Sequence, residues 1–119
     1  MKALLPLITA ATILGSNALQ ASEIFIGAWA SGTKEVLQIT EKGGDLSAEF
    51  VRENVKSEFE RIRFPAKYQD GALIITGEQG DLSARYDSGN KLLILGGMKS
   101  FQKLSSEQAQ QLINQLEKK

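Results

Sequence analysis

The stretch GDLSAEF (residues 44–50) returns almost unchanged as GDLSARY (residues 80–86). The match extends upstream, because Ile39-Thr40 precedes the first copy at the same distance as Ile75-Thr76 precedes the second. Apolar and polar residues alternate in both copies, which is typical of a β-strand with one buried face. We therefore predict a repeated β-hairpin whose copies share one inward face. Its expected inward residues are Leu46, Ala48 and Phe50, and Leu82, Ala84 and Tyr86.

Turn residues divide the rest of the chain into short runs. Glycine, asparagine and aspartate tolerate the positive φ that tight connections need. Such regular spacing favours an all-β meander over helices with crossovers. The expected strands are residues 24–30, 35–41, 45–52, 58–68, 72–76, 81–86, 91–95 and 99–103. Because an open sheet of this size would expose two edges, we predict a mainly β fold, a small antiparallel meander barrel of about eight strands.

One segment, residues 47–62, also fits a helix. Val51, Val55, Phe59 and Ile62 follow helical spacing, and charged helix formers lie between them. The repeat favours the β interpretation, because turn residues leave the second copy no room for a helix. We predict a hairpin that turns at residues 54–57. In the strand that follows, Pro65 is tolerated only at an edge or a bulge, so a bend is expected there.

The C-terminal segment is predicted to be an α-helix over residues 105–117. Ser105 or Ser106 is a suitable N-cap, and Gln108 stands where a capping box with Ser105 requires it. Its apolar stripe consists of Ala109, Leu112, Ile113 and Leu116. We expect this stripe to cover the sheet rather than to bind a partner.

The N-terminal segment predicts export. Lys2 is followed by an apolar run and then by small and polar residues, which is typical of a signal peptide over residues 1–21. The apolar run of this segment is short for a membrane span, which needs about 20 residues. No span is expected in the mature chain. Residues 22–119 are then one domain, located in a bacterial periplasm or secreted.

The composition excludes several classes of function. The 119 residues include 14 Lys and Arg against 14 Asp and Glu, and neither cysteine nor histidine occurs. A neutral chain gives no indication of nucleic-acid binding. Without histidine, the commonest general base and zinc ligand are missing. Carboxylates are ample, but no acid–base pair, nucleophile with a base, or metal cluster stands out, so neither catalysis nor a metal or other cofactor is expected. Asp45 and Asp81 begin their strands directly after glycine, where aspartate is a routine turn residue.

A family resemblance rests on three residues, Gly27, Trp29 and Lys103. Gly27 and Trp29 belong to the triplet GAW on the first expected strand, and Lys103 lies on the last. Together with the meander and the terminal helix, they resemble the lipocalin-like, or calycin, barrels. The resemblance implies that Trp29 closes one end of the barrel, that Lys103 lies across it, and that the barrel holds an apolar or amphiphilic molecule.

The predicted barrel interior is the first candidate binding site. An eight-stranded barrel is either filled by its side chains or holds one small ligand. Its candidate lining residues are Ala48, Phe50, Phe64, Tyr68 and Tyr86. Small residues such as Ala48 leave room for a slim apolar pocket, but they equally pack against large neighbours in ordinary cores.

A second candidate surface is a basic stripe of Arg61, Arg63 and Lys67 on the fourth expected strand. It favours binding to an extracytoplasmic protein, for example as an inhibitor or immunity factor against a secreted or cell-wall-directed enzyme. The alternative is a solvated outer face that prevents edge pairing. The sequence thus predicts an exported, non-catalytic binding protein, and leaves open whether a small molecule or a protein is bound.

Overall fold

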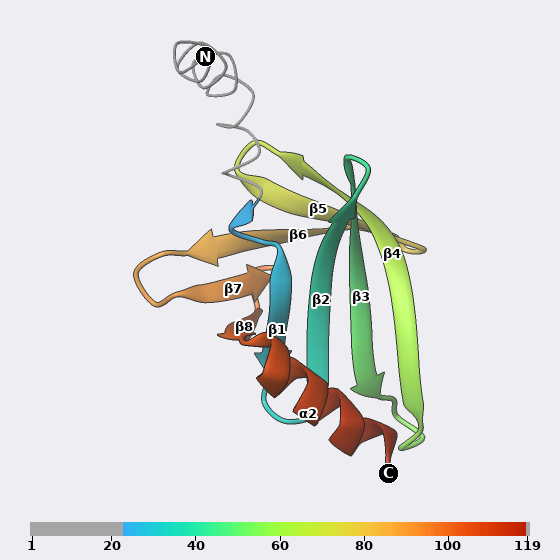
Figure 1. Ribbon diagram of the computed structural model, residues 1–119. Helices are drawn as coiled ribbons and strands as arrows, with labels where there is room; N and C mark the ends of the chain where they lie inside the picture. The colour runs from blue at the N-terminus through green and yellow to red at the C-terminus, as the bar shows by residue number, and fades with distance from the viewer. Residues whose placement is uncertain (1–22, 119) are drawn as a thin grey trace, which may run out of the picture.

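The computed structural model describes residues 23–118, and the predicted signal peptide lies outside them. Eight antiparallel strands follow one another around a closed barrel, and one helix follows the last strand (Figure 1). The elements are β1 Gly27–Ser31, β2 Glu35–Lys42, β3 Asp45–Glu53, β4 Phe59–Gln69, β5 Ala72–Gly77, β6 Gly80–Asp87, β7 Leu92–Leu95, β8 Lys99–Leu104 and α2 Ser106–Glu117. The predicted fold class is confirmed. Within residues 23–118, every helix falls short of the length and apolarity that a membrane crossing requires.

The two copies of the repeat form the β2–β3 and β5–β6 hairpins. Ile39 pairs with Ala48, whereas its counterpart Ile75 pairs with Leu82 instead of Ala84. The pairing is therefore shifted by two residues between the copies. Because side chains alternate with a period of two, this shift keeps the same face inward.

The contested segment is a β-hairpin, as the repeat predicted. β3 ends at Glu53 and β4 begins at Phe59. Between them the Asn54 side chain accepts hydrogen bonds from the backbone N–H groups of Lys56 and Glu58, at 2.9 and 3.0 Å. Ser57 takes a positive φ of 62°. These hydrogen bonds stabilise the turn, which explains why the segment forms a hairpin although its apolar residues have helical spacing.

The first strand begins at Gly27, three residues later than the expected start at Ile24, so that boundary was wrong. Gly27 has a φ of +132°, which turns the chain at the first residue of the strand. Phe25 then folds against the core, and its carbonyl accepts a 2.9 Å hydrogen bond from the indole Nε1 of Trp29. Local turn chemistry, rather than strand pairing, places Phe25 at the barrel end.

Apolar side chains fill the barrel interior. The buried cluster consists of Phe25, Trp29, Leu37, Ile39, Ala48, Phe50, Leu73, Ile75, Ala84, Leu93, Leu95 and Phe101. Phe50 and Phe64 pack edge to face with ring centroids 6.0 Å apart. Each large side chain of this kind contributes roughly 1.5–3 kcal/mol by its removal from water.

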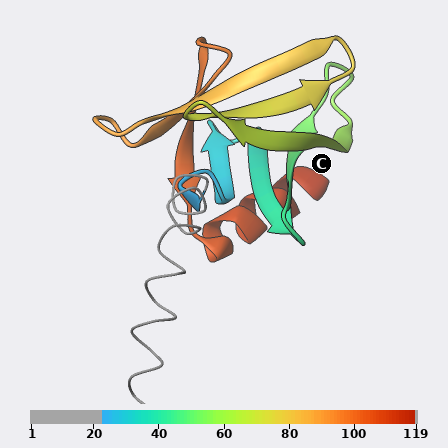
Figure 2. The same cartoon turned by 90° about the horizontal axis from the view of Figure 1, so that it is seen from above.

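The helix covers the outside of the barrel (Figure 2). Ile113 and Leu116 are buried against Val36 and Val51, which point outward from β2 and β3. Ser105 is the N-cap, and it forms the expected capping box with Gln108. The apolar stripe of α2 is therefore used within the chain, as predicted.

Candidate functional site

The fourth strand is paired on both sides over only part of its length. Residues 59–66 of β4 pair with β3, whereas β5 pairs with β4 only over residues 66–69. Within the described residues, no strand pairs with the second side of residues 59–65. Pro65, which has no N–H to donate, stands where the pairing with β5 stops. Pro65 thus lies at an edge, which is one of the two positions, edge or bulge, at which a proline is tolerated in a strand.

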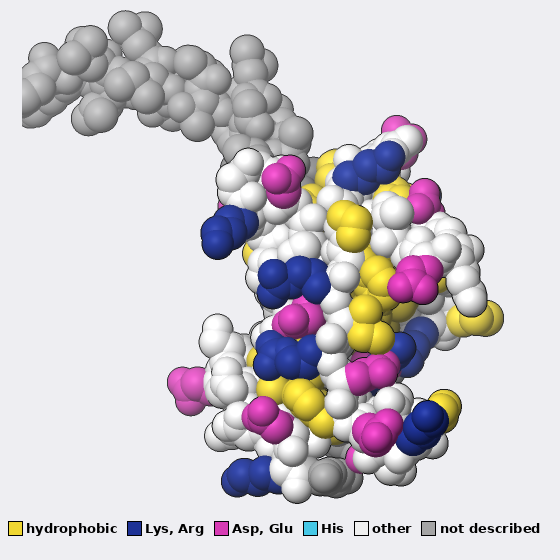
Figure 3. All heavy atoms as spheres, turned by 90° about the vertical axis from the view of Figure 1, so that its right-hand side faces the viewer, with side chains coloured by type: hydrophobic (Ala, Val, Ile, Leu, Met, Phe, Trp, Pro, Cys, Tyr) yellow, Lys and Arg dark blue, Asp and Glu magenta, His cyan; other side chains and the backbone are white. Residues whose placement is uncertain are grey.

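The unpaired part of β4 leaves a hollow in the barrel wall, which we call the side groove. Its volume is about 530 Å³, and its lining residues are Arg52, Ile62, Phe64, Gly77, Glu78, Gln79, Gly80, Asp81 and Leu82. Ile62 and Phe64 are only half-buried, and Leu82 is 43 % exposed. Figure 3 faces this side and shows apolar side chains at the surface beside charged ones. Apolar side chains therefore remain accessible along the groove.

Acidic side chains form one rim of the side groove. Glu78 in the β5–β6 turn and Asp81 at the start of β6 are exposed, and no ion pair among residues 23–118 involves either of them. Arg52, the groove's basic residue, already binds Glu35 and Glu60. The rim is therefore electronegative, which favours a cationic group on any ligand.

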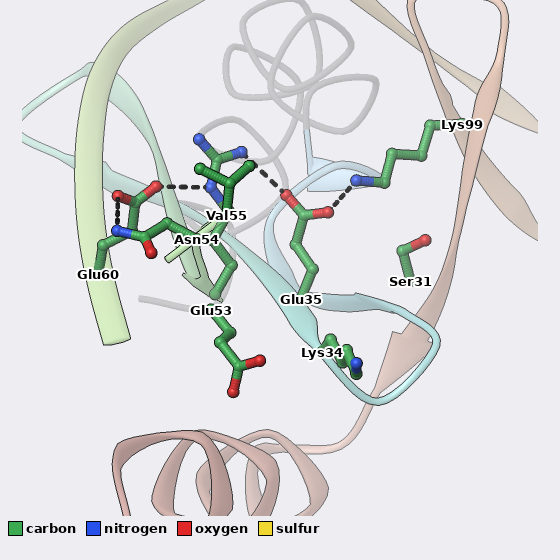
Figure 4. Close-up of a pocket in the computed structure, with 9 residues that line it drawn as sticks. Ser31, Lys34, Glu35, Glu53, Asn54, Val55, Glu60 and Lys99 are labelled. Atoms are coloured by element: carbon green, nitrogen blue, oxygen red, sulfur yellow. Dashed lines mark hydrogen bonds and ion pairs between the residues drawn. The ribbon is translucent and has the colours of Figure 1, made fainter. Parts of the chain in front are cut away.

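Next to the side groove, four charged residues lie together at the end of the barrel where β2, β4 and β8 begin; we call Glu35, Arg52, Glu60 and Lys99 the end network. Arg52 donates from Nε to Glu60 at 2.8 Å and contacts Glu35 at 3.4 Å. Lys99 binds the other oxygen of Glu35 (Figure 4). Glu35 is buried, so its charge needs both cations. These residues border a second hollow of about 580 Å³.

The end network shifts two pKa values. The hydrogen bond to Arg52, with a smaller contribution from Asn54, lowers the pKa of Glu60. The hydrogen bond to Glu60 in turn raises the pKa of Arg52 above its ordinary value. Both shifts keep the pair ionised, which is typical of a structural ion pair. An acid or base poised for proton transfer would instead have its pKa moved towards neutrality.

Near the start of β1, the three residues of the family resemblance meet. Lys103 pairs with Trp29 across the β1–β8 closure, and its Nζ lies 4.6 Å from the centroid of the Trp29 ring. The same Nζ donates a 2.6 Å hydrogen bond to the carbonyl of Ile26. A Cβ on Gly27 would lie 2.5 Å from this Nζ, so a larger residue would displace the end of the lysine side chain. Burial against the barrel end lowers the pKa of Lys103.

The five predicted lining residues all lie on the inward face, at different depths. Ala48 and Phe50 are buried in the core, where Ala48 packs among larger residues. Phe64, Tyr68 and Tyr86 are half-buried at its edge, and Phe64 also lines the side groove. The structure thus brings only Phe64 of the five to the side groove.

Two of the three residues of the basic stripe form ion pairs within the chain. Arg61 and Arg63 lie 2.9 and 3.6 Å from the two carboxylate oxygens of Glu49 on β3. Lys67 lies farther along β4, at a different hollow that also contains Arg85. Neutralisation by Glu49 weakens this stripe as a surface for an acidic partner.

Sequence reasoning missed the end network and two residues of the side groove, Ile62 and Leu82, as binding residues. Glu35 is in phase with Leu37 and Ile39 on β2, and Arg52 is in phase with Phe50 on β3. A charge in phase with the inward face of a strand is a signal that could have found this network. The exposure of Leu82 has no comparable signal, because it depends on where β5 leaves β4.

Comparisons with protein-family models, with curated proteins and with solved structures found no match for this chain.

Proposed function

We propose that this chain is an exported, non-catalytic binding protein of lipocalin-like architecture, and that it holds an apolar or amphiphilic ligand in the side groove. The observation that carries the proposal is the exposure of Ile62, Phe64 and Leu82 along a hollow of about 530 Å³. Apolar side chains that line a concave surface are the usual mark of a ligand site.

The lipocalin-like part of the proposal is supported by the barrel end. Lys103 covers Trp29 as the resemblance implies, and Gly27 makes the approach possible. The proposed ligand site nevertheless differs from a central cavity, because fully buried side chains such as Leu37 and Phe101 occupy the barrel interior. The side groove is the more accessible apolar surface.

A neutral apolar fluorophore such as N-phenyl-1-naphthylamine tests the proposal. Its emission should rise on binding to the native protein, and Leu82→Ser should weaken the binding severalfold, because this exposed side chain lines the groove. Met98→Ser is the matched control, since Met98 is 92 % exposed and does not line the groove. No binding, or equal losses in both variants, would remove the groove as the site.

A second candidate, an inhibitor or immunity factor that binds a secreted enzyme, is favoured by a separate observation. The open side of β4 offers backbone groups to another chain, as unpaired strand edges do. A protein that co-purifies in native mass spectrometry would support this candidate, whereas a retained small mass would support a carrier.

A further inference from the structure

We propose that the open edge of β4 accepts an extended segment of a partner polypeptide as an added strand, with apolar side chains in the side groove and basic side chains facing Glu78 and Asp81. The inference rests on the proposed function, because it names the class of amphiphile that the side groove binds. Three features of the described residues support it: a free backbone edge, an apolar lining and a negative rim.

The backbone edge is the first feature. In an antiparallel ladder, alternate residues direct their N–H and C=O groups to the strand on either side. Residues 59–65 of β4 are satisfied by β3 on one side, and no described strand lies in register on the other. Pro65 has no N–H, so an added strand would bond along residues 59–64. This is the length of an ordinary strand, roughly 5–6 residues.

The apolar lining is the second feature. A strand added to β4 sends every second side chain towards the groove. There it would meet Ile62 and Phe64 from β4 and Leu82 from β6 across the hollow. Main-chain hydrogen bonds would then supply affinity, and the apolar contacts would select the residue type at alternate positions.

The charge of the rim is the third feature, and it favours a basic partner segment over an acidic one. Glu78 and Asp81 lie on the rim without an ion pair among the described residues, while Arg52 is held by Glu35 and Glu60. A segment that alternates apolar and basic residues complements this rim. An acidic segment would meet like charges.

Exposed strand edges are commonly protected by charged side chains, and Arg61 and Arg63 are natural candidates for that role. However, both side chains reach across to Glu49 on β3, which lies on the side of β4 opposite to the open edge. The two arginines are thereby held over the β3–β4 pair and leave the edge accessible.

The test uses an acetylated, amidated hexapeptide of alternating valine and lysine, and two analogues that are N-methylated at the valines or at the lysines. An added strand directs only one of these two sets of N–H groups at β4. One analogue should therefore bind about tenfold more weakly or worse, while the other keeps the parent affinity. Hydrogen exchange should slow at amides within residues 59–64. A glutamate peptide should bind less well than the lysine peptide.

The outcomes separate this inference from the proposed function. If both analogues bind like the parent peptide, or if exchange within residues 59–64 is unchanged, no strand is added and the inference is wrong. The same holds if the fluorophore binds but the lysine peptide does not. In each of these cases fluorophore binding would still support the groove as an amphiphile site. If neither peptide nor fluorophore binds, both proposals fail. Glu78→Gln with Asp81→Asn should weaken the lysine peptide selectively, and leave the neutral fluorophore unaffected.

Discussion

Gly27 is the residue whose backbone allows Lys103 to cross the barrel end. It combines a φ of +132° with a distance of only 2.5 Å between the point that a Cβ would occupy and the Lys103 Nζ. A side chain at this position would be strained by its backbone and would displace the lysine from Ile26 and Trp29. The glycine and the lysine are therefore coupled, although they lie on the first and last strands.

We expect Gly27→Ala to destabilise the fold by about 1–3 kcal/mol. In a Lys103→Ala background the steric part is absent, so the effect of Gly27→Ala should be smaller. Gly32→Ala is the control, because Gly32 has a φ of +63° but nothing within 4 Å of the point that its Cβ would occupy. A double-mutant cycle in urea measures the coupling. Strictly additive effects would contradict the contact.

The lowered pKa of Glu60 predicts part of the pH dependence of the free energy of unfolding. Its pKa is lowered in the folded chain, chiefly by the hydrogen bond to Arg52. A carboxyl group of this kind contributes stability above its unfolded pKa of about 4.3, and the contribution is lost as pH falls through the lower folded value. The free energy of unfolding should therefore fall less between pH 7 and pH 3 in Glu60→Gln than in the parent.

Glu58→Gln is the matched control for this measurement. Glu58 precedes β4, is exposed, and its side chain forms no hydrogen bond or ion pair with the described residues. Urea unfolding at several pH values compares the variants. Parallel pH profiles for Glu60→Gln and Glu58→Gln would show that the Arg52 contact does not govern this part of the titration.

Among the elements, the two repeated hairpins have nearly the same sequence pattern, but their neighbouring strands differ. Ala84 is fully buried, whereas Leu82, two residues earlier on the same inward face, is 43 % exposed. The expectation that the whole apolar face of this copy is buried is therefore wrong at Leu82. The reason is that β4 does not continue alongside β5 beyond Ile75, so no strand among residues 23–118 covers the start of β6.

Aspartate substitutions distinguish the two positions. Ala84→Asp places a charge in the core and should abolish cooperative folding. Leu82→Asp keeps its carboxylate at the groove rim, so we expect a folded protein whose stability changes by less than about 1.5 kcal/mol. Thermal unfolding followed by circular dichroism compares them. Similar losses in both variants would mean that Leu82 is buried in solution.

On the scale of the whole molecule, Glu35 joins strands that are far apart in the chain. It lies at the start of β2 and binds Lys99 on β8 as well as Arg52 on β3. Glu35 is buried, while its two partners are partly exposed. The end network thus joins β2, β3, β4 and β8 across the β1–β8 closure.

Glu35→Gln should destabilise the protein by about 1–3 kcal/mol, because Lys99 loses its carboxylate partner while Arg52 keeps only Glu60. This is below the range for fully buried pairs, since water screens the two cations. Glu41→Gln on the exposed end of β2 is the control. Denaturant unfolding gives both values. The proposal of a structural network would be wrong if the two substitutions had the same small effect.

Much of the architecture follows from sequence patterns of short range. Alternation determines which face of each strand is apolar, and closely spaced turn residues require neighbouring strands to pair with each other. The repeat predicted two hairpins with the same inward face, and both are present. Ser105 and Gln108 predicted the start of α2 in the same way, since a capping box involves residues three positions apart.

The side groove and the end network depend on register between strands, which alternation does not encode. A two-residue shift preserves the inward face, so the sequence pattern is equally compatible with either pairing of the repeated hairpins. The closure of the eight-stranded barrel determines that the pairing between β4 and β5 ends at Ala66. It also brings Lys99 to Glu35. Sequence alone determined strands, faces and the terminal helix, while tertiary structure decided which inward side chains stay exposed, because exposure depends on neighbours from distant parts of the chain.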